Sequence, residues 1–140
     1  MDRRKFIKST CAIGLGITGT AALLESCKKT QSSTTPQGPT VNFQLNLNQT
    51  ANSALNSTGG TLSSNGVLIV NTGNGGYTAI AQTCTHNGCS VGYSVSGNNF
   101  ICPCHSGVYD INGNVTSGPP PAPLKKYVVT KNGVILTIAG

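Results

Sequence analysis

Cysteine and histidine side chains are concentrated in two short segments of the sequence. The first segment is residues 84–89 (CTHNGC), and the second is residues 102–107 (CPCHSG). Each segment offers one cysteine and one histidine at short range, together with a second cysteine. Two thiolates and two imidazoles can hold one zinc ion tetrahedrally. They can also hold a [2Fe–2S] cluster, with the thiolates on one iron and the imidazoles on the other. The residue types alone do not separate these two metal centres.

The spacing of the two segments allows them to meet in space. Between His86 and Cys102 lie 15 residues, which is enough for one hairpin out and back. The second cysteine of each segment, Cys89 and Cys104, could then join the two loops by a disulfide, which an exported domain can keep. The alternative is a pair of free buried thiols. Gly88 and Gly107 suit tight turns beside a metal centre.

The elements that must position these loops are short strands. Residues 41–47 alternate apolar and polar side chains, as in a half-buried strand. Further short apolar runs, separated by turn signals rich in glycine and asparagine, lie at 67–70, 77–81, 91–95, 99–101, 109–111, 127–130 and 134–138. Eight or nine short strands in about 100 residues predict an all-β fold, a small antiparallel sandwich or barrel. Long helices and doubly wound folds are excluded.

The charge of the chain is concentrated at its N-terminus. The 140 residues carry a net charge of +6, but only 9% of them are charged, which is too few for a nucleic-acid-binding surface. Beyond Thr40 three lysines stand against one acidic residue, Asp110, so this part has a charge of 3 − 1 = +2. We therefore expect no nucleic-acid partner.

Residues 1–26 are predicted to be an export signal. A basic stretch is followed by an apolar run of about 14 residues, residues 11–24, whereas a bilayer-spanning helix needs roughly 20. A signal peptide is therefore the better interpretation. The segment 2–8 (DRRKFIK) resembles a twin-arginine signal, whose export route carries folded proteins. An ordinary secretory signal is the alternative.

A membrane attachment is expected next to this signal. Residues 24–27 (LESC) resemble a lipobox, which would make Cys27 the lipidated N-terminus of the mature chain. The alternative is an uncleaved signal anchor, and both interpretations tether the protein to a membrane. Residues 27–39 are polar with two prolines and are predicted to be a flexible tether. Residues 40–140 are predicted to be the folded domain.

The two loop motifs, followed by residues 118–124 (GPPPAPL), resemble a Rieske iron–sulfur protein over about residues 81–129. The resemblance implies a Rieske-type domain with an inserted cluster-binding subdomain at about residues 82–124, and one [2Fe–2S] cluster per chain. It implies that Cys84 and Cys102 bind the inner iron, that His86 and His105 bind the outer iron, and that Cys89 and Cys104 form a disulfide. The implied surroundings of the cluster are Gly88, Ser106, Gly107, Tyr109 and the proline-loop residues Gly118, Pro119, Pro120 and Pro121.

Several positions bear on the reduction potential that the resemblance implies. Tyr109 stands where membrane-complex members have a tyrosine that donates to a ligand sulfur. Ser106 and Gly107 reverse the family's Gly-Ser order, so the side-chain donor to a bridging sulfide is lost. Asn87 is polar, whereas quinol-oxidising members have an apolar residue there. The donor kept at Tyr109 and the donor lost at Gly107 predict a potential in the middle of the Rieske range. Asn87 and Gly107 both weaken the case for a quinol oxidase subunit.

The resemblance implies electron transfer as a membrane-tethered subunit or partner of a respiratory oxidoreductase, rather than stand-alone catalysis. The implied partner is a redox protein, a cytochrome or a quinol-oxidase-type complex. A cytochrome bc-type subunit competes with a subunit similar to the small subunit of arsenite oxidase. The expected location is the periplasmic side of a bacterial membrane, with a lipid or signal anchor. An alternative from another class is a zinc-stabilised exported β binding module without a redox role.

Overall fold

The structure is a computed structural model that describes residues 38–140. The predicted export signal, Cys27 and nearly all of the predicted tether lie outside the described residues. Within residues 38–140 no helix is long and apolar enough to cross a membrane.

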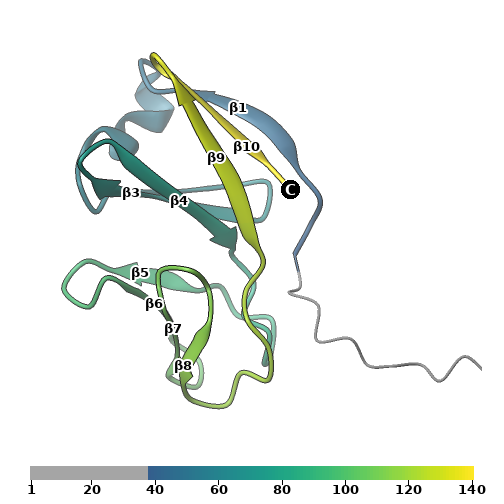
Figure 1. The fold of residues 1–140 in the computed structure, drawn as a ribbon. Coiled ribbons are helices and arrows are strands. Elements are labelled where there is room, and N and C mark those ends of the chain that lie inside the picture. The colour runs from purple at the N-terminus through teal and green to yellow at the C-terminus, as the bar shows by residue number, and fades with distance from the viewer. Residues whose placement is uncertain (1–37) are drawn as a thin grey trace, which may run out of the picture. The chain divides into compact units, whose positions relative to one another are not determined.

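The described residues form two antiparallel sheets, so the predicted all-β class is confirmed (Figure 1). The six-stranded sheet has the order β1-β10-β9-β4-β3-β2, and the four-stranded sheet has the order β5-β6-β7-β8. The elements are β1 (Asn42–Asn46), the 3-10 helix η1 (Thr50–Asn56), β2 (Thr61–Ser64), β3 (Val67–Gly73), β4 (Gly76–Ala81), β5 (Gly92–Ser94), β6 (Asn99–Cys102), β7 (Gly107–Tyr109), β8 (Val115–Ser117), β9 (Lys126–Asn132) and β10 (Ile135–Ala139).

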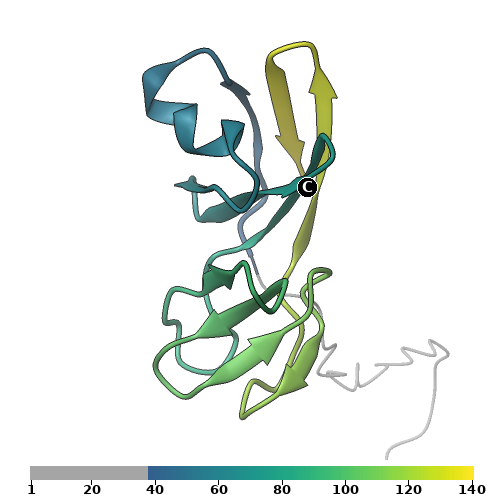
Figure 2. The same cartoon turned by 90° about the vertical axis from the view of Figure 1, so that its left-hand side faces the viewer.

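The small sheet is an insertion between two neighbouring strands of the large sheet. β4 and β9 pair directly, with Ala79 opposite Tyr127 and Ile80 opposite Lys126. Everything between these strands, including β5 to β8 and both cysteine–histidine loops, leaves the large sheet and returns to it (Figure 2). The fold therefore carries an inserted subdomain, as the resemblance implied.

The continuous apolar run at 67–70 is explained by burial on both faces of β3. Val67 and Ile69 belong to one hydrophobic core of the large sheet. Leu68 and Val70 face the other side, where they pack in a second core with residues of the small sheet such as Phe100. Successive strand residues point to opposite faces, so a strand covered on both sides needs apolar residues at every position. This second core is what fixes the inserted subdomain against the large sheet.

The expected number of eight or nine strands is wrong, because the described residues contain ten. β2 (TLSS) and β8 (VTS) each contain one strongly apolar residue, and both are edge strands of their sheets. β2 and β8 contain no buried residue, so they carry almost no hydrophobic pattern. The helix η1 was also not expected. Its Asn52 is buried and donates through Nδ2 to the carbonyl of Asn46 at 2.8 Å, which ties the helix to the end of β1.

Candidate metal centre

Both cysteine–histidine loops belong to the inserted subdomain, one before β5 and the other between β6 and β7. The first loop runs from the end of β4 to β5. Within it, the Cys84 N–H donates to the carbonyl of Cys89 (2.8 Å), and the Gly88 N–H donates to the carbonyl of Cys84 (3.0 Å). Gly88 has a φ of +73°, a left-handed conformation that glycine adopts without strain. These contacts close residues 84–89 into a compact turn.

The second loop is the four-residue connection between β6 and β7. Cys102 ends β6 directly opposite Gly107, the first residue of β7. Ser106 has a φ of +56°, a conformation that non-glycine residues adopt at a cost. The turn in this loop is therefore made at Ser106, and the expectation that Gly107 provides the turn conformation is wrong.

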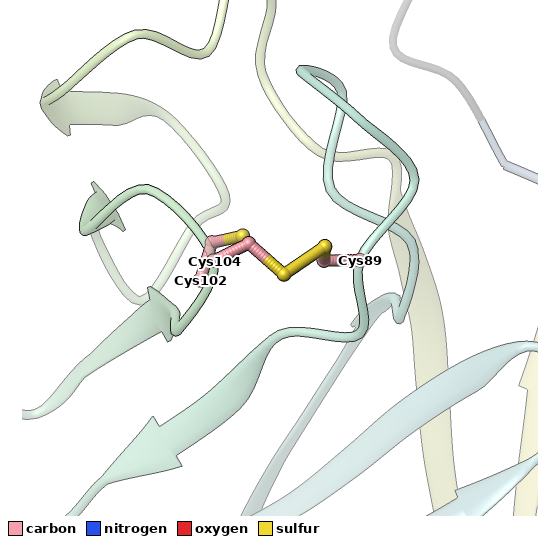
Figure 3. A group of neighbouring side chains, drawn as sticks. All are labelled: Cys89, Cys102 and Cys104. Atoms are coloured by element: carbon pink, nitrogen blue, oxygen red, sulfur yellow. A yellow bond between two sulfur atoms is a disulfide. The ribbon is translucent and has the colours of Figure 1, made fainter.

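The two loops are joined covalently by the disulfide between Cys89 and Cys104, with a Cα–Cα distance of 6.5 Å (Figure 3). The alternative of two free thiols therefore does not describe this structure. Cys102 lies beside the bond, and its Sγ and the two disulfide sulfurs all lie within 4.8 Å of one another. Two of these three sulfurs are bonded to each other, so this group is a disulfide packed against a thiol and not a three-thiolate metal site.

The other two cysteines of these loops, Cys84 and Cys102, are buried thiols. Their exposed fractions are 3% and 1%, and both belong to the hydrophobic core that joins the two sheets. Neither is in a disulfide. The structure therefore brings together the two thiols that the sequence predicted as ligands, in a position shielded from water.

His86 and His105 are exposed and face each other across the two loops. Their Nδ1 atoms are 3.3 Å apart, and their rings meet edge to face at an angle of 82°. Two nitrogens that bind one tetrahedral metal ion at about 2.0–2.1 Å are about 3.3 Å from each other. The two imidazoles are therefore placed so that both Nδ1 atoms could bind one ion.

The four candidate ligands separate into a buried sulfur pair and an exposed nitrogen pair. A single zinc ion would need all four ligand atoms within about 4 Å of one another. Within residues 38–140, the group of ligand atoms that lie within 4.8 Å of one another contains Cys102 but neither Cys84 nor a histidine. The arrangement therefore fits a binuclear centre with thiolates on the inner metal and imidazoles on the outer metal better than it fits one ion.

The surroundings of Cys84 favour its thiolate. Burial alone would raise the pKa of the Cys84 thiol. Hydrogen bonds from the Tyr109 side chain, the His86 backbone, the Cys102 side chain and the Asn87 backbone outweigh burial, so the pKa of Cys84 lies below its ordinary value. Metal ligands must be deprotonated, so the lowered pKa of Cys84 favours metal binding.

Tyr109 is completely buried, and its hydroxyl lies 3.2 Å from Cys84 Sγ. Burial raises the pKa of Tyr109, and the hydrogen bond with Cys84 raises it further, so the phenol keeps its hydrogen. The same hydroxyl also contacts Thr85, which sequence reasoning did not single out. Thr85 Oγ1 donates to the carbonyl of Ala122 at 2.7 Å. No local pattern could reveal this, because Ala122 lies 37 residues further along the chain.

The proline loop packs directly on the second ligand loop. A Cβ on Gly118 would lie 2.8 Å from the Cα of Gly107, and a Cβ on Gly107 would lie 2.6 Å from Cγ of Pro120. Pro120 is buried, whereas Pro119 and Pro121 are exposed. Gly107 is therefore required for close approach, and the absence of a side chain there makes room for the Pro120 ring.

Known proteins with similar sequences support this interpretation. The model of the Rieske [2Fe-2S] domain family matches residues 43–128. The cytochrome b6-f complex iron-sulfur subunit of Chlorobaculum thiosulfatiphilum is 41% identical over 73 residues, which are 52% of this chain and 40% of that protein. The subunit of the same name from Prochlorococcus marinus (strain MIT 9215) is 50% identical over 58 residues, which are 41% of this chain and 33% of that protein.

A solved structure with a similar fold is the ferredoxin of carbazole 1,9a-dioxygenase from Nocardioides aromaticivorans IC177. It has a TM-score of 0.52 and 23% identity, over 61% of this chain and 91% of that chain. At this identity the similarity concerns the fold alone. The chain spans 40% or less of the length of the two curated relatives described above, so the similarity concerns this domain and not their full length.

Proposed function

The chain belongs to the Rieske [2Fe-2S] domain family, and on this premise we propose that it is an exported, membrane-tethered electron carrier that serves a respiratory oxidoreductase. The observation that carries the proposal is the separation of the candidate ligands into buried thiols and exposed imidazoles. An electron carrier needs a centre that is protected from water and yet lies close to the surface that meets its partner.

In the proposed ligand set, Cys84 and Cys102 bind the inner iron and His86 and His105 bind the outer iron. The burial of both thiols in the same hydrophobic core supports the first pair. The 3.3 Å distance between the two Nδ1 atoms supports the second pair. The Cys89–Cys104 disulfide holds the loops that carry these ligands, so the geometry does not depend on the metal alone.

The ligand types determine the chemistry that the bound cluster supplies, which is the uptake and release of one electron at a high potential. Two ferric ions, two sulfides and two thiolates have a total charge of +6 − 4 − 2 = 0, whereas four thiolates would give −2. Adding an electron to a neutral cluster costs less than adding it to an anion. Rieske centres accordingly have potentials of about −150 to +300 mV, against about −400 mV for plant-type ferredoxins.

The two loops that carry the exposed histidines have no charged side chains, because residues 82–107 contain no Asp, Glu, Lys or Arg. Charged side chains accelerate the encounter of partners by long-range attraction, and these loops have none. A membrane tether supplies the alternative, because it raises the effective concentration of the domain beside a membrane-bound partner.

The relatives named as cytochrome b6-f iron-sulfur subunits support a cytochrome-type complex as the partner. Two features of the chain differ from quinol-oxidising subunits, namely the polar Asn87 and the lack of a side-chain hydroxyl at Gly107. These two features favour a partner enzyme in which the carrier takes electrons from another redox protein and not from a quinol. An enzyme resembling arsenite oxidase remains the second candidate complex.

The experiment that tests this proposal is spectroscopy of the chain purified from the membrane fraction of an expressing bacterium. We expect a red-brown protein with two irons per chain and, after reduction, an EPR signal whose average g value is below that of the free electron. The matched control is the Cys84→Ser/Cys102→Ser double variant, which keeps the disulfide and should be colourless. A colourless wild-type protein with one zinc per chain would overturn the proposal.

A further inference from the structure

The side chain of Thr85 lies between the metal centre and the proline loop. Its Oγ1 is 2.7 Å from the carbonyl oxygen of Ala122 and 3.2 Å from the hydroxyl of Tyr109. Its backbone N–H donates to the same Tyr109 hydroxyl at 3.3 Å. Thr85 therefore contacts Tyr109 twice, and its neighbours in the sequence are the two proposed ligands Cys84 and His86.

Counting hydrogens fixes the direction of these bonds. A threonine hydroxyl has one hydrogen, and a carbonyl oxygen can only accept. The short contact with Ala122 therefore uses the one hydrogen of Thr85. Toward Tyr109, Thr85 Oγ1 is left as an acceptor.

Tyr109 also has one hydroxyl hydrogen, and it has two acceptors for it. Cys84 Sγ lies at 3.2 Å, and Thr85 Oγ1 also lies at 3.2 Å. A thiolate bound to iron has no hydrogen of its own, so it competes with the threonine oxygen for the phenol hydrogen. The carbonyl of Ala122 maintains this competition, because it keeps the Thr85 hydrogen turned away from Tyr109.

We propose that Thr85 is a positioning residue that shares the Tyr109 hydrogen with Cys84 and thereby keeps the reduction potential below the value that full donation to sulfur would give. The proposal rests on the proposed cluster function. Hydrogen bonds to the sulfurs of an iron–sulfur cluster are one of the determinants of its potential. They stabilise the reduced state more, because reduction places additional negative charge on the acceptor.

The test is a double-mutant cycle on the cluster-containing chain, with the midpoint potential as its readout. Thr85→Val keeps the shape of the side chain and removes the competing acceptor, so the potential should rise. Thr85→Ser keeps the hydroxyl and should leave the potential unchanged. Tyr109→Phe removes the shared hydrogen and should lower the potential. In the Tyr109→Phe background, Thr85→Val should produce no further shift.

The effect of Thr85→Val in the wild-type and in the Tyr109→Phe background separates hydrogen sharing from a structural disturbance of the loops. Loss of the Thr85–Ala122 bond would admit water to the cluster in both backgrounds. A change in midpoint potential of the same size in both would therefore overturn the proposal. An unchanged potential in Thr85→Val would also overturn it. The temperature at which the visible absorption is lost should fall on Thr85→Val in both backgrounds, because the Ala122 bond is broken in both.

If Thr85→Val does not retain the cluster, the cycle is repeated with Thr85→Ala, which removes the same hydroxyl. Loss of the cluster in both variants would assign Thr85 a structural role and contradict the proposal. A wild-type chain without the Rieske EPR signal would instead contradict the proposed function, so the two failures are distinguishable.

Discussion

The ring of Pro120 lies so close to Gly107 that a Cβ on this glycine would approach Cγ of Pro120 to 2.6 Å and Cδ to 3.0 Å. Real Cβ atoms essentially never approach other heavy atoms to less than 3.0 Å. The second ligand loop and the ring of Pro120 are therefore closely packed, and any side chain at residue 107 must push them apart.

Gly107→Ala is expected to destabilise the domain by about 1–3 kcal/mol, the usual cost of forcing extra atoms into a packed site. The measurement is the temperature at which the visible absorption of the cluster is lost. Ser106→Gly is the matched control next to it. It relieves the left-handed conformation at Ser106 and should leave stability equal or slightly higher.

Gly107→Ser separates packing from hydrogen bonding at the same position. It adds the same Cβ as Gly107→Ala, and in addition a hydroxyl that could donate to a bridging sulfide. The loss of stability should match that of Gly107→Ala, whereas only Gly107→Ser should raise the potential. If Gly107→Ala is as stable as the wild type, the contact with Pro120 does not have the consequence argued here.

Removal of the disulfide should weaken retention of the cluster without changing the ligands. Cys89 and Cys104 are 15 positions apart, and a cross-link that closes a loop of this size contributes about 3 kcal/mol in the chain-entropy model. The Cys89→Ser/Cys104→Ser double variant leaves no unpaired partner near Cys102. It should bind the cluster with an unchanged EPR spectrum and lose it at a lower temperature. Mass spectrometry after alkylation checks the disulfide in the mature wild-type protein. Free thiols at both Cys89 and Cys104 would contradict this prediction.

The fold class was predictable because most strands have a strong local pattern. The alternation at 41–47 indicated β1, and the run at 67–70 indicated β3, whose residues are buried on both faces. The edge strands β2 and β8 could not be predicted, because their hydrogen bonds to neighbouring strands give them their conformation. The turn signal between the runs at 91–95 and 99–101 was correct, because β5 and β6 form a hairpin there, and Asn98 in this turn has a left-handed conformation (φ +47°).

The candidate site was only partly predictable. Residue type and spacing indicated a metal centre in the two loops, because chemistry restricts which side chains bind metal, and the resemblance to Rieske proteins implied the ligand set Cys84, His86, Cys102 and His105. Thr85 was missed because its role depends on Ala122, which only folding brings near. The role of Gly107 was misjudged for the same reason. Its neighbour Pro120 belongs to another loop, and close approach between loops has no signature in the local sequence.

Asp110 should make the stability of the domain depend on pH in the acid range. It accepts hydrogen bonds from the backbone N–H groups of Asn112 (2.8 Å) and Asn114 (2.9 Å), and from the Asn114 side chain (2.9 Å). Burial acts to raise the pKa of Asp110, but these bonds and the charge of Lys126 outweigh it, so the pKa lies below its ordinary value. The folded state therefore holds the proton more weakly than the unfolded state does.

From this sign it follows that the stabilisation is fully present above the unfolded pKa, about 3.9, and is lost as the pH falls through the folded value. Urea unfolding of wild type and Asp110→Asn at pH 7 and near pH 3 measures it. The wild type should be more stable than Asp110→Asn at pH 7, and the difference should shrink near pH 3. Acid release of the cluster affects both proteins, so the difference between them isolates Asp110. A difference that does not change with pH would contradict the assignment.

Replacement of one histidine ligand by cysteine should lower the potential. His86→Cys or His105→Cys exchanges a neutral ligand for an anionic one, so the oxidised cluster would change from a charge of 0 to −1. The difference between Rieske centres and plant-type ferredoxins corresponds to two such exchanges, so one exchange should lower the potential on the order of 200 mV. Because the two Nδ1 atoms are 3.3 Å apart and both rings are exposed, the two variants should behave alike.

Protein-film voltammetry measures this shift. The matched control is Asn87→Ala, an exposed change beside His86 that alters no ligand and should preserve the potential. A variant with an intact cluster and an unchanged potential would show that the replaced histidine is not a ligand.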